Sequence, residues 1–314
     1  MVASANQHAR TMTYGNGLAL VLAAGVVWSA MGLGVRMIHE ATAFQILFYR
    51  SLGVLPCLFL LLALRSGGHP MRALANAGVA SILGGLGLVV AFMGSIISLV
   101  ETSVANAAFL WATAPLYSAI LGRFVLGEPV RASTWGSIVI AAVGVALMVY
   151  EGISLGHLYG NIAALVCALG FAAFTVALRW EPGGDSLPAT FFGGLYCCIA
   201  SGIAATVAGQ SLLIPAHDAG IAFALGFFVL SGGLTLYTYG SRVVPAAELP
   251  LLSLTEVVLG PAWVYLAIGE SAGRLTLLGG VIVLMALALS AIAGLRMDRR
   301  GPATARGPKR TVTA

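Results

Sequence analysis

The sequence predicts an all-α membrane protein with ten transmembrane helices arranged as two inverted five-helix repeats. Three observations lead to this fold class: the composition, the spacing of apolar stretches and an internal repeat. Of the 314 residues, 59% are hydrophobic and 9% are charged, against about 25% charged residues in a typical soluble protein. The mean hydropathy is +0.97. Such a chain has too few polar side chains to cover a water-exposed surface, so we expect a lipid bilayer as its solvent.

Glycine and cysteine fit the same environment. The chain has 40 glycines, and small residues let helix backbones approach closely in lipid. The four cysteines lie in apolar stretches, without the spacings of zinc or haem sites: Cys57, Cys167, Cys197 and Cys198. We therefore expect no metal ion and no cofactor.

Ten apolar stretches are each near the ~20 residues that a spanning helix needs. The first follows Arg10, as in a signal peptide, but it is longer than the usual apolar core and recurs later in the chain, so we keep it as structure. The ten predicted spans are 16–37, 44–64, 74–95, 103–125, 133–150, 159–179, 189–209, 219–239, 244–268 and 274–294.

The distribution of basic residues predicts the orientation. Thirteen of the 16 Lys and Arg residues fall on the side of the N-terminus, and only Arg36 and Arg274 fall on the other. Cytoplasmic loops carry the excess of positive charge, so both termini are expected in the cytoplasm and the protein in the inner or plasma membrane. Six basic residues cluster in segment 295–314. We interpret it as a cytoplasmic tail and expect no nucleic-acid partner.

An internal repeat relates the two halves of the chain. Residues 14–25 (YGNGLALVLAAG) and 159–170 (YGNIAALVCALG) share eight of twelve positions. A second match, offset by 142 residues, sets 102–128 against 244–270 and aligns Gly127-Glu128 with Gly269-Glu270. We therefore expect two five-helix repeats, 14–150 and 159–294. Because each has an odd number of helices, the second enters the membrane from the opposite side, and such inverted repeats favour alternating access.

The fourth and fifth predicted spans carry a recognisable pattern. Ala114-Pro115 lies mid-span, Leu126-Gly127-Glu128 ends that span, and a Gly-containing helix follows from Trp135. This resembles the EamA-type repeat of the drug/metabolite transporter superfamily, with Thr255-Glu256-Val257 and Ile268-Gly269-Glu270 as its second copy.

The resemblance covers essentially residues 14–294 and includes similarity to amino-acid and aromatic-amino-acid exporters. It implies a ten-helix carrier with a central cavity. Val257 departs from the pattern, in which proline often follows the glutamate, so a helix break in the second copy is expected from Pro250 or Pro261.

Two charged residues fall inside predicted spans. Arg50 lies about two turns from the outer end of the second span, and Glu256 lies near the middle of the ninth. Glu248 precedes Glu256 by eight residues, which places both acids on one helical face. Intramembrane charges commonly mark substrate or ion pathways. Arg50 and Glu256 are therefore candidates for substrate binding, and the alternative, a structural ion pair between them, stays open.

Five uncharged residues complete the candidate substrate site. The repeat places the face of Asn106 in the fourth span opposite that of Glu256, and Trp111 and Thr113 flank this face. Aromatic side chains of other spans are expected to form an apolar wall, with Tyr49 and Tyr237 among them.

The predicted function is secondary transport of a small metabolite by alternating access, most simply amino-acid export. Nucleosides, sugars and neutral aromatic compounds are alternative substrates, and a coupling proton or ion and the oligomeric state stay open. The five histidines fall in the tail or in loops: His8, His39, His69, His157 and His217. With no catalytic cluster at membrane depth, we expect neither an enzyme nor catalytic residues. A channel would need a continuous polar pore, which the spans do not offer.

Overall fold

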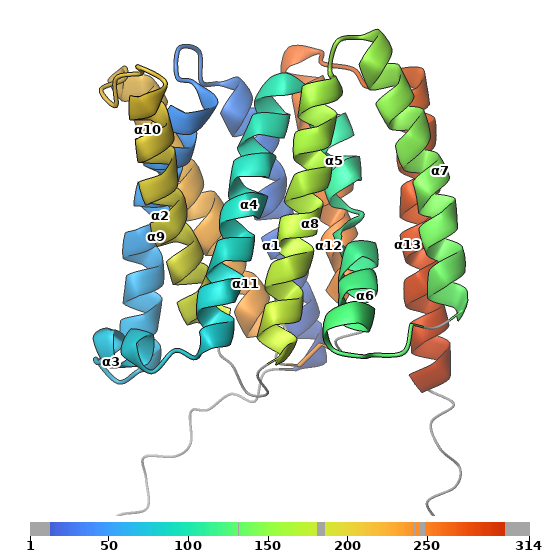
Figure 1. Ribbon diagram of the computed structural model, residues 1–314, viewed down its shortest axis with the longest axis horizontal. Coiled ribbons are helices and arrows are strands. Elements are labelled where there is room, and N and C mark those ends of the chain that lie inside the picture. Colours follow the sequence, from blue (N-terminus) through green and yellow to red (C-terminus); the bar gives the residue numbers. More distant parts are fainter. Residues whose placement is uncertain (1–12, 131, 181–185, 241–242, 245–248, 299–314) are drawn as a thin grey trace, which may run out of the picture.

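The computed structural model describes residues 13–130, 132–180, 186–240, 243–244 and 249–298, and every element in these ranges is a helix (Figure 1). The helices of the first half are α1 (Tyr14–Arg36), α2 (Ala43–Arg65), α3 (Pro70–Ala75), α4 (Val79–Glu101), α5 (Val104–Trp111), α6 (Ala114–Val125) and α7 (Ala132–Ser154). Those of the second half are α8 (Leu158–Trp180), α9 (Ser186–Val207), α10 (Ala216–Ala224), the π-helix η1 (Leu225–Leu230), α11 (Ser231–Gly240), α12 (Leu249–Ile268) and α13 (Arg274–Asp298).

These helices form ten segments that can each cross a membrane. Nine spans in the described residues are long and apolar enough to cross a membrane, and the apolar helix Leu254–Ile268 lies within a tenth crossing, α12. The ten-helix membrane fold is thereby confirmed. We call the face where α1 begins and α13 ends the lower face, and the face where α1 ends the upper face (Figure 1). Segment 299–314 of the predicted tail lies outside the described residues.

The third span is shifted from its predicted position. The sequence predicted 74–95, but the chain forms the short α3 and then α4, which starts after Gly78 and continues to Glu101. The prediction was wrong because Ser95 and Ser98 do not end the helix. Each hydroxyl donates to the carbonyl three residues earlier, at 2.8 Å and 2.9 Å, so these polar groups are satisfied within α4.

Helix irregularities also differ from the prediction. The span predicted over 103–125 is interrupted between α5 and α6, where Pro115 lies in the first turn of α6 and needs no N–H partner. The Thr113 hydroxyl donates to the Leu110 carbonyl at 2.6 Å beside this interruption. The expected break at Pro261 is absent, because α12 runs unbroken from Leu249 to Ile268 with Pro261 inside it. Pro250 lies at the start of α12, and residues 245–248 before it lie outside the described residues.

Small residues bring helices of the two halves together. Helix α4 packs mainly on α8 and α9, α1 on α12 and α11, and α7 on α13. A Cβ on Gly94 of α4 would lie 2.6 Å from the Ala163 carbonyl oxygen and 2.8 Å from the Cys167 nitrogen of α8. Only glycine permits the two helix backbones to lie this close. Such close packing stabilises helix contacts in lipid, where no hydrophobic effect acts between helices.

Gly94→Ala should therefore destabilise the fold by about 1–3 kcal/mol, as overpacking of a tight interface does. Gly136→Ala is the matched control, since a Cβ on this glycine of α7 meets nothing within 4 Å. The control should be neutral or slightly stabilising. Thermal unfolding of both variants in detergent measures the difference, and equal melting temperatures would contradict this account of the α4–α8 contact.

Candidate functional site

Arg50 lies buried in α2, two turns from the start of the helix, with 2% of its surface exposed. Its guanidinium donates to the Ser95 hydroxyl and the Phe92 carbonyl of α4, both at 3.4 Å, and lies 5.0 Å from the centre of the Phe92 ring. The two hydrogen bonds are long, and Nε has no partner. The protein therefore leaves part of this cation's bonding capacity unused.

No carboxylate within 4.0 Å neutralises Arg50 among the residues that the structure describes. Glu256 of α12 is partly buried and forms neither a hydrogen bond nor an ion pair with any described residue. The structural ion pair between Arg50 and Glu256 that the sequence left open is therefore not formed in this conformation.

A row of polar groups on α4 links Arg50 to Trp111. Ser95 accepts from Arg50, and Ser98, one turn further along α4, accepts from the Trp111 indole at 3.1 Å. Trp111 is only partly buried, at the end of α5. The structure thus brings two of the predicted site residues to one face of α4, and sequence reasoning missed the serines that join them.

Asn106 and Thr113 are buried and bonded to protein. Asn106 donates to the Thr102 hydroxyl at 3.1 Å and to the side chain of Asn161, which in turn donates to the Met148 carbonyl at 3.4 Å. The Asn106 Oδ1 has no partner. The Thr113 hydroxyl donates to the Leu110 carbonyl, between α5 and α6. In this conformation Asn106 and Thr113 join helices through these bonds.

The two predicted tyrosines contact different parts of the protein. The Tyr49 hydroxyl donates to the Leu212 carbonyl at 2.9 Å and so fixes the loop before α10. Tyr237 of α11 packs against Trp28 of α1, with ring centres 5.6 Å apart. Glu248 lies outside the described residues.

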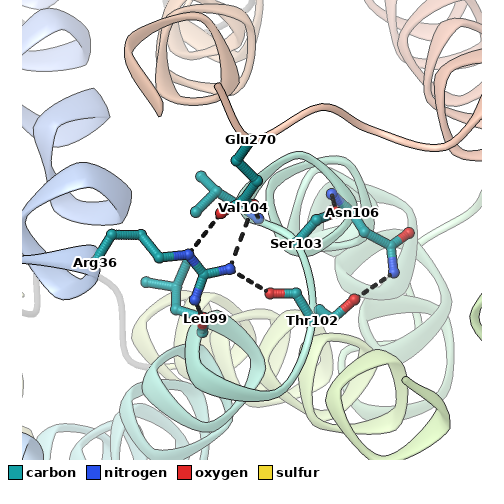
Figure 2. Close-up of polar contacts among 7 residues, drawn as sticks. All are labelled: Arg36, Leu99, Thr102, Ser103, Val104, Asn106 and Glu270. Atoms are coloured by element: carbon teal, nitrogen blue, oxygen red, sulfur yellow. Dashed lines mark hydrogen bonds and ion pairs between the residues drawn. The ribbon is translucent and has the colours of Figure 1, made fainter. Parts of the chain in front are cut away.

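A cluster that the sequence did not predict lies at the upper face (Figure 2). Arg36, the last residue of α1, contacts Glu270 through Nε at 2.6 Å and donates to the Leu99 and Thr102 carbonyls at 2.5 Å and 2.8 Å. Glu270 also accepts from the Val104 N–H at 2.8 Å, at the start of α5. The cluster joins α1, α4, α5 and the α12–α13 loop, and a pocket of about 280 Å³ borders Glu270.

A second ion pair lies at the lower face. Arg179, near the end of α8, donates to Glu128 of the α6–α7 loop at 2.5 Å. Sequence reasoning aligned Gly127-Glu128 with Gly269-Glu270 through the repeat but named no partner residue for either glutamate. It missed the arginines, although both stand in the last turns of α1 and α8, helices whose starts the repeat aligns.

One group among the described residues has the spacing to hold a metal ion. His39, His217 and Asp218 place one ligand atom each within 4.8 Å of one another at the upper face. Asp218 is already engaged, because it accepts from the Glu40 and Ala41 N–H groups at 2.8 Å and 3.0 Å and contacts the His217 ring at 3.0 Å. These bonds fix the α1–α2 loop to the start of α10.

The first half of the chain is similar to a known protein family. Residues 15–150 match the EamA-like transporter family. The chain carries an EamA-like transporter family domain. The matched segment spans α1 to α7, and the family's transporter description agrees with the apolar helices found there.

Two further similarities extend beyond the first half of the chain. An uncharacterized transporter of Archaeoglobus fulgidus is 27% identical over 282 residues, which cover 88% of this chain and 95% of that protein. A solved crystal structure is 17% identical and superimposes with a TM-score of 0.62, covering 90% of this chain and 99% of that one. At this identity the structural likeness shows the fold alone.

The bonding of Asn106 makes its role testable. Asn106→Ala and Asn161→Ala should each destabilise the protein by about 1 kcal/mol, the usual scale of a side-chain hydrogen bond between membrane helices. The double variant should lose less than the sum, because both changes remove the same contact. Thermal unfolding in detergent measures this, with the exposed Asn76→Ala of the α3 cap as control. Additive losses would show that the two residues act separately.

Proposed function

We propose that this protein is an EamA-type transporter that exports a small zwitterion, an amino acid, across the plasma membrane by alternating access. The observation that carries the proposal is Arg50, a buried cation with an unpartnered Nε and no carboxylate within 4.0 Å in the described part of the chain. A charge at the centre of a membrane helix costs about 2.5–3.5 kcal/mol on insertion scales. A carboxylate ligand would offset this cost with charge-assisted hydrogen bonds to the guanidinium.

Glu256 supports a ligand with two charges. Its carboxylate has no bonding partner among the described residues. An amino acid has a carboxylate for Arg50 and an ammonium group for Glu256. Trp111, bonded to the same face of α4 as Arg50, supplies an aromatic surface for an apolar side chain.

The internal repeat supports alternating access. We propose that the two repeats are residues 14–150 and 159–294. The packing is consistent with it, because α1 packs on α12 of the other half while α8 packs on α5 and α6. Inverted repeats of this kind hold the substrate near the midplane and expose it by rocking one half against the other. A cytoplasmic location of both termini follows from the charge bias of the sequence. A coupling proton or ion is compatible with this mechanism.

The proposal is tested by flux in proteoliposomes. Wild-type protein should show counterflow of amino acids, and Arg50→Gln and Glu256→Gln should each lower kcat/KM for them by about 10- to 100-fold, the scale of one lost hydrogen bond to a charged group. Arg72→Gln and Glu40→Gln are matched controls, because both side chains are exposed and outside the site. They should transport as the wild type does.

Two results would count against the amino acid. Unchanged flux in well-folded Arg50→Gln would remove Arg50 from substrate binding and favour a neutral aromatic metabolite, a nucleoside or a sugar. Poor expression of both single variants with recovery in the double variant would instead indicate that the two charges pair structurally in another conformation. Right-side-out and inverted vesicles compared in the same assay give the direction of transport.

A further inference from the structure

Two ion pairs join the halves of the chain, one at each face of the membrane. Arg36 of the first half contacts Glu270 of the second at the upper face, and Arg179 of the second half contacts Glu128 of the first at the lower face. Both therefore cross the interface between 14–150 and 159–294. Neither pair belongs to the candidate substrate site around Arg50.

The two pairs are locally alike. Each glutamate follows a glycine in the left-handed region that comes just after a helix, Gly127 with φ +70° after α6 and Gly269 with φ +71° after α12. Each arginine stands in the last turn of a 23-residue helix, α1 or α8. The repeat aligns the starts of α1 and α8 and aligns the two glycine–glutamate pairs. The same contact is thus built twice, with the halves exchanged and the membrane face reversed.

The contacts are unequal in this conformation. At the upper face Arg36 donates to Glu270, Leu99 and Thr102, and the paired side chains are 22% and 21% exposed. At the lower face the single bond between Arg179 and Glu128 joins side chains that are 48% and 40% exposed. Exposed ion pairs are weak and screened by solvent. The upper contact is the tighter of the two.

We infer that the Arg36–Glu270 and Arg179–Glu128 pairs are reciprocal latches of the transport cycle, and that the structure represents the state closed at the upper face. Rocking one half against the other separates helix ends at one face as it brings them together at the opposite face. One latch then closes as the other opens. The inference rests on the alternating access of the proposed function, but not on the identity of the substrate.

Amide hydrogen exchange of the full-length protein in lipid nanodiscs tests this without any substrate. Two regions report: 99–106 at the upper face, which contains the Val104 N–H bonded to Glu270, and 122–130 at the lower face, which contains the Glu128 N–H bonded to the Gly122 carbonyl. The decisive reading is at the face away from the mutation. Glu270→Gln should slow exchange in 122–130, and Glu128→Gln should slow it in 99–106, each on the order of tenfold.

Matched control variants distinguish a latch from an ion pair that stabilises only its own face. Glu101→Gln removes an exposed carboxylate at the upper end of α4, and Arg123→Gln removes an exposed cation near the lower end of α6. Neither should change exchange at the opposite face. The charge swap Glu128→Arg with Arg179→Glu should restore exchange in 99–106 to the wild-type rate.

Faster exchange only at the mutated face, with the opposite face unchanged, would overturn the inference. The two ion pairs would then stabilise their own faces independently of each other. Glu128→Gln keeps the test decisive if Glu270→Gln folds poorly, because the lower pair is more exposed than the upper pair. A lack of amino-acid flux would refute the proposed substrate and would leave this result untouched. The two failures are therefore distinguishable.

Discussion

The charge of Arg50 is the constraint on which the centre of this membrane protein depends. A guanidinium this deep in an apolar protein has to be surrounded by groups that lower its cost, and α4 provides them through Ser95, the Phe92 carbonyl and the Phe92 ring. These are dipoles and a π-system, not a counter-charge. The protein thus tolerates the cation without neutralising it, and an anionic ligand could still add to its bonding.

Close backbone packing holds Arg50 in this place. Helix α2 crosses the junction of α10 and η1, where Gly226 of η1 faces the Arg50 carbonyl and Gly53 of α2 faces the Phe223 carbonyl of α10. A Cβ at either glycine would collide with that backbone. The crossing lies at the start of η1, where the helix changes to π geometry and the Ser231 hydroxyl donates to the Gly226 carbonyl at 3.0 Å. Such π-helical turns are frequent at functional sites. Here the turn lies directly against the residue whose charge the proposed function uses.

Hydropathy was sufficient to predict the ten crossings, because in lipid every backbone polar group must be satisfied within the helix and apolar length alone selects the spans. Local hydrogen bonding was not predictable from it. Ser95 and Ser98 continue α4 instead of ending it, and α12 passes through Pro261. Within the site, the sequence selected Arg50 and Glu256 as rare intramembrane charges. It could not show that Asn106 bonds to Asn161 or that Arg36 meets Glu270, since these contacts join residues 55 and 234 positions apart.

The central claim is that Arg50 is free to bind the carboxylate of a ligand. Equilibrium binding of an amino acid, compared with the amine that lacks only its carboxylate, tests this most directly on purified wild-type protein and on Arg50→Gln. We expect the amine to bind the wild type at least about tenfold more weakly, as befits one lost hydrogen bond to a charged group, and the difference to vanish in Arg50→Gln. Equal binding of the two ligands by the wild type would contradict the claim.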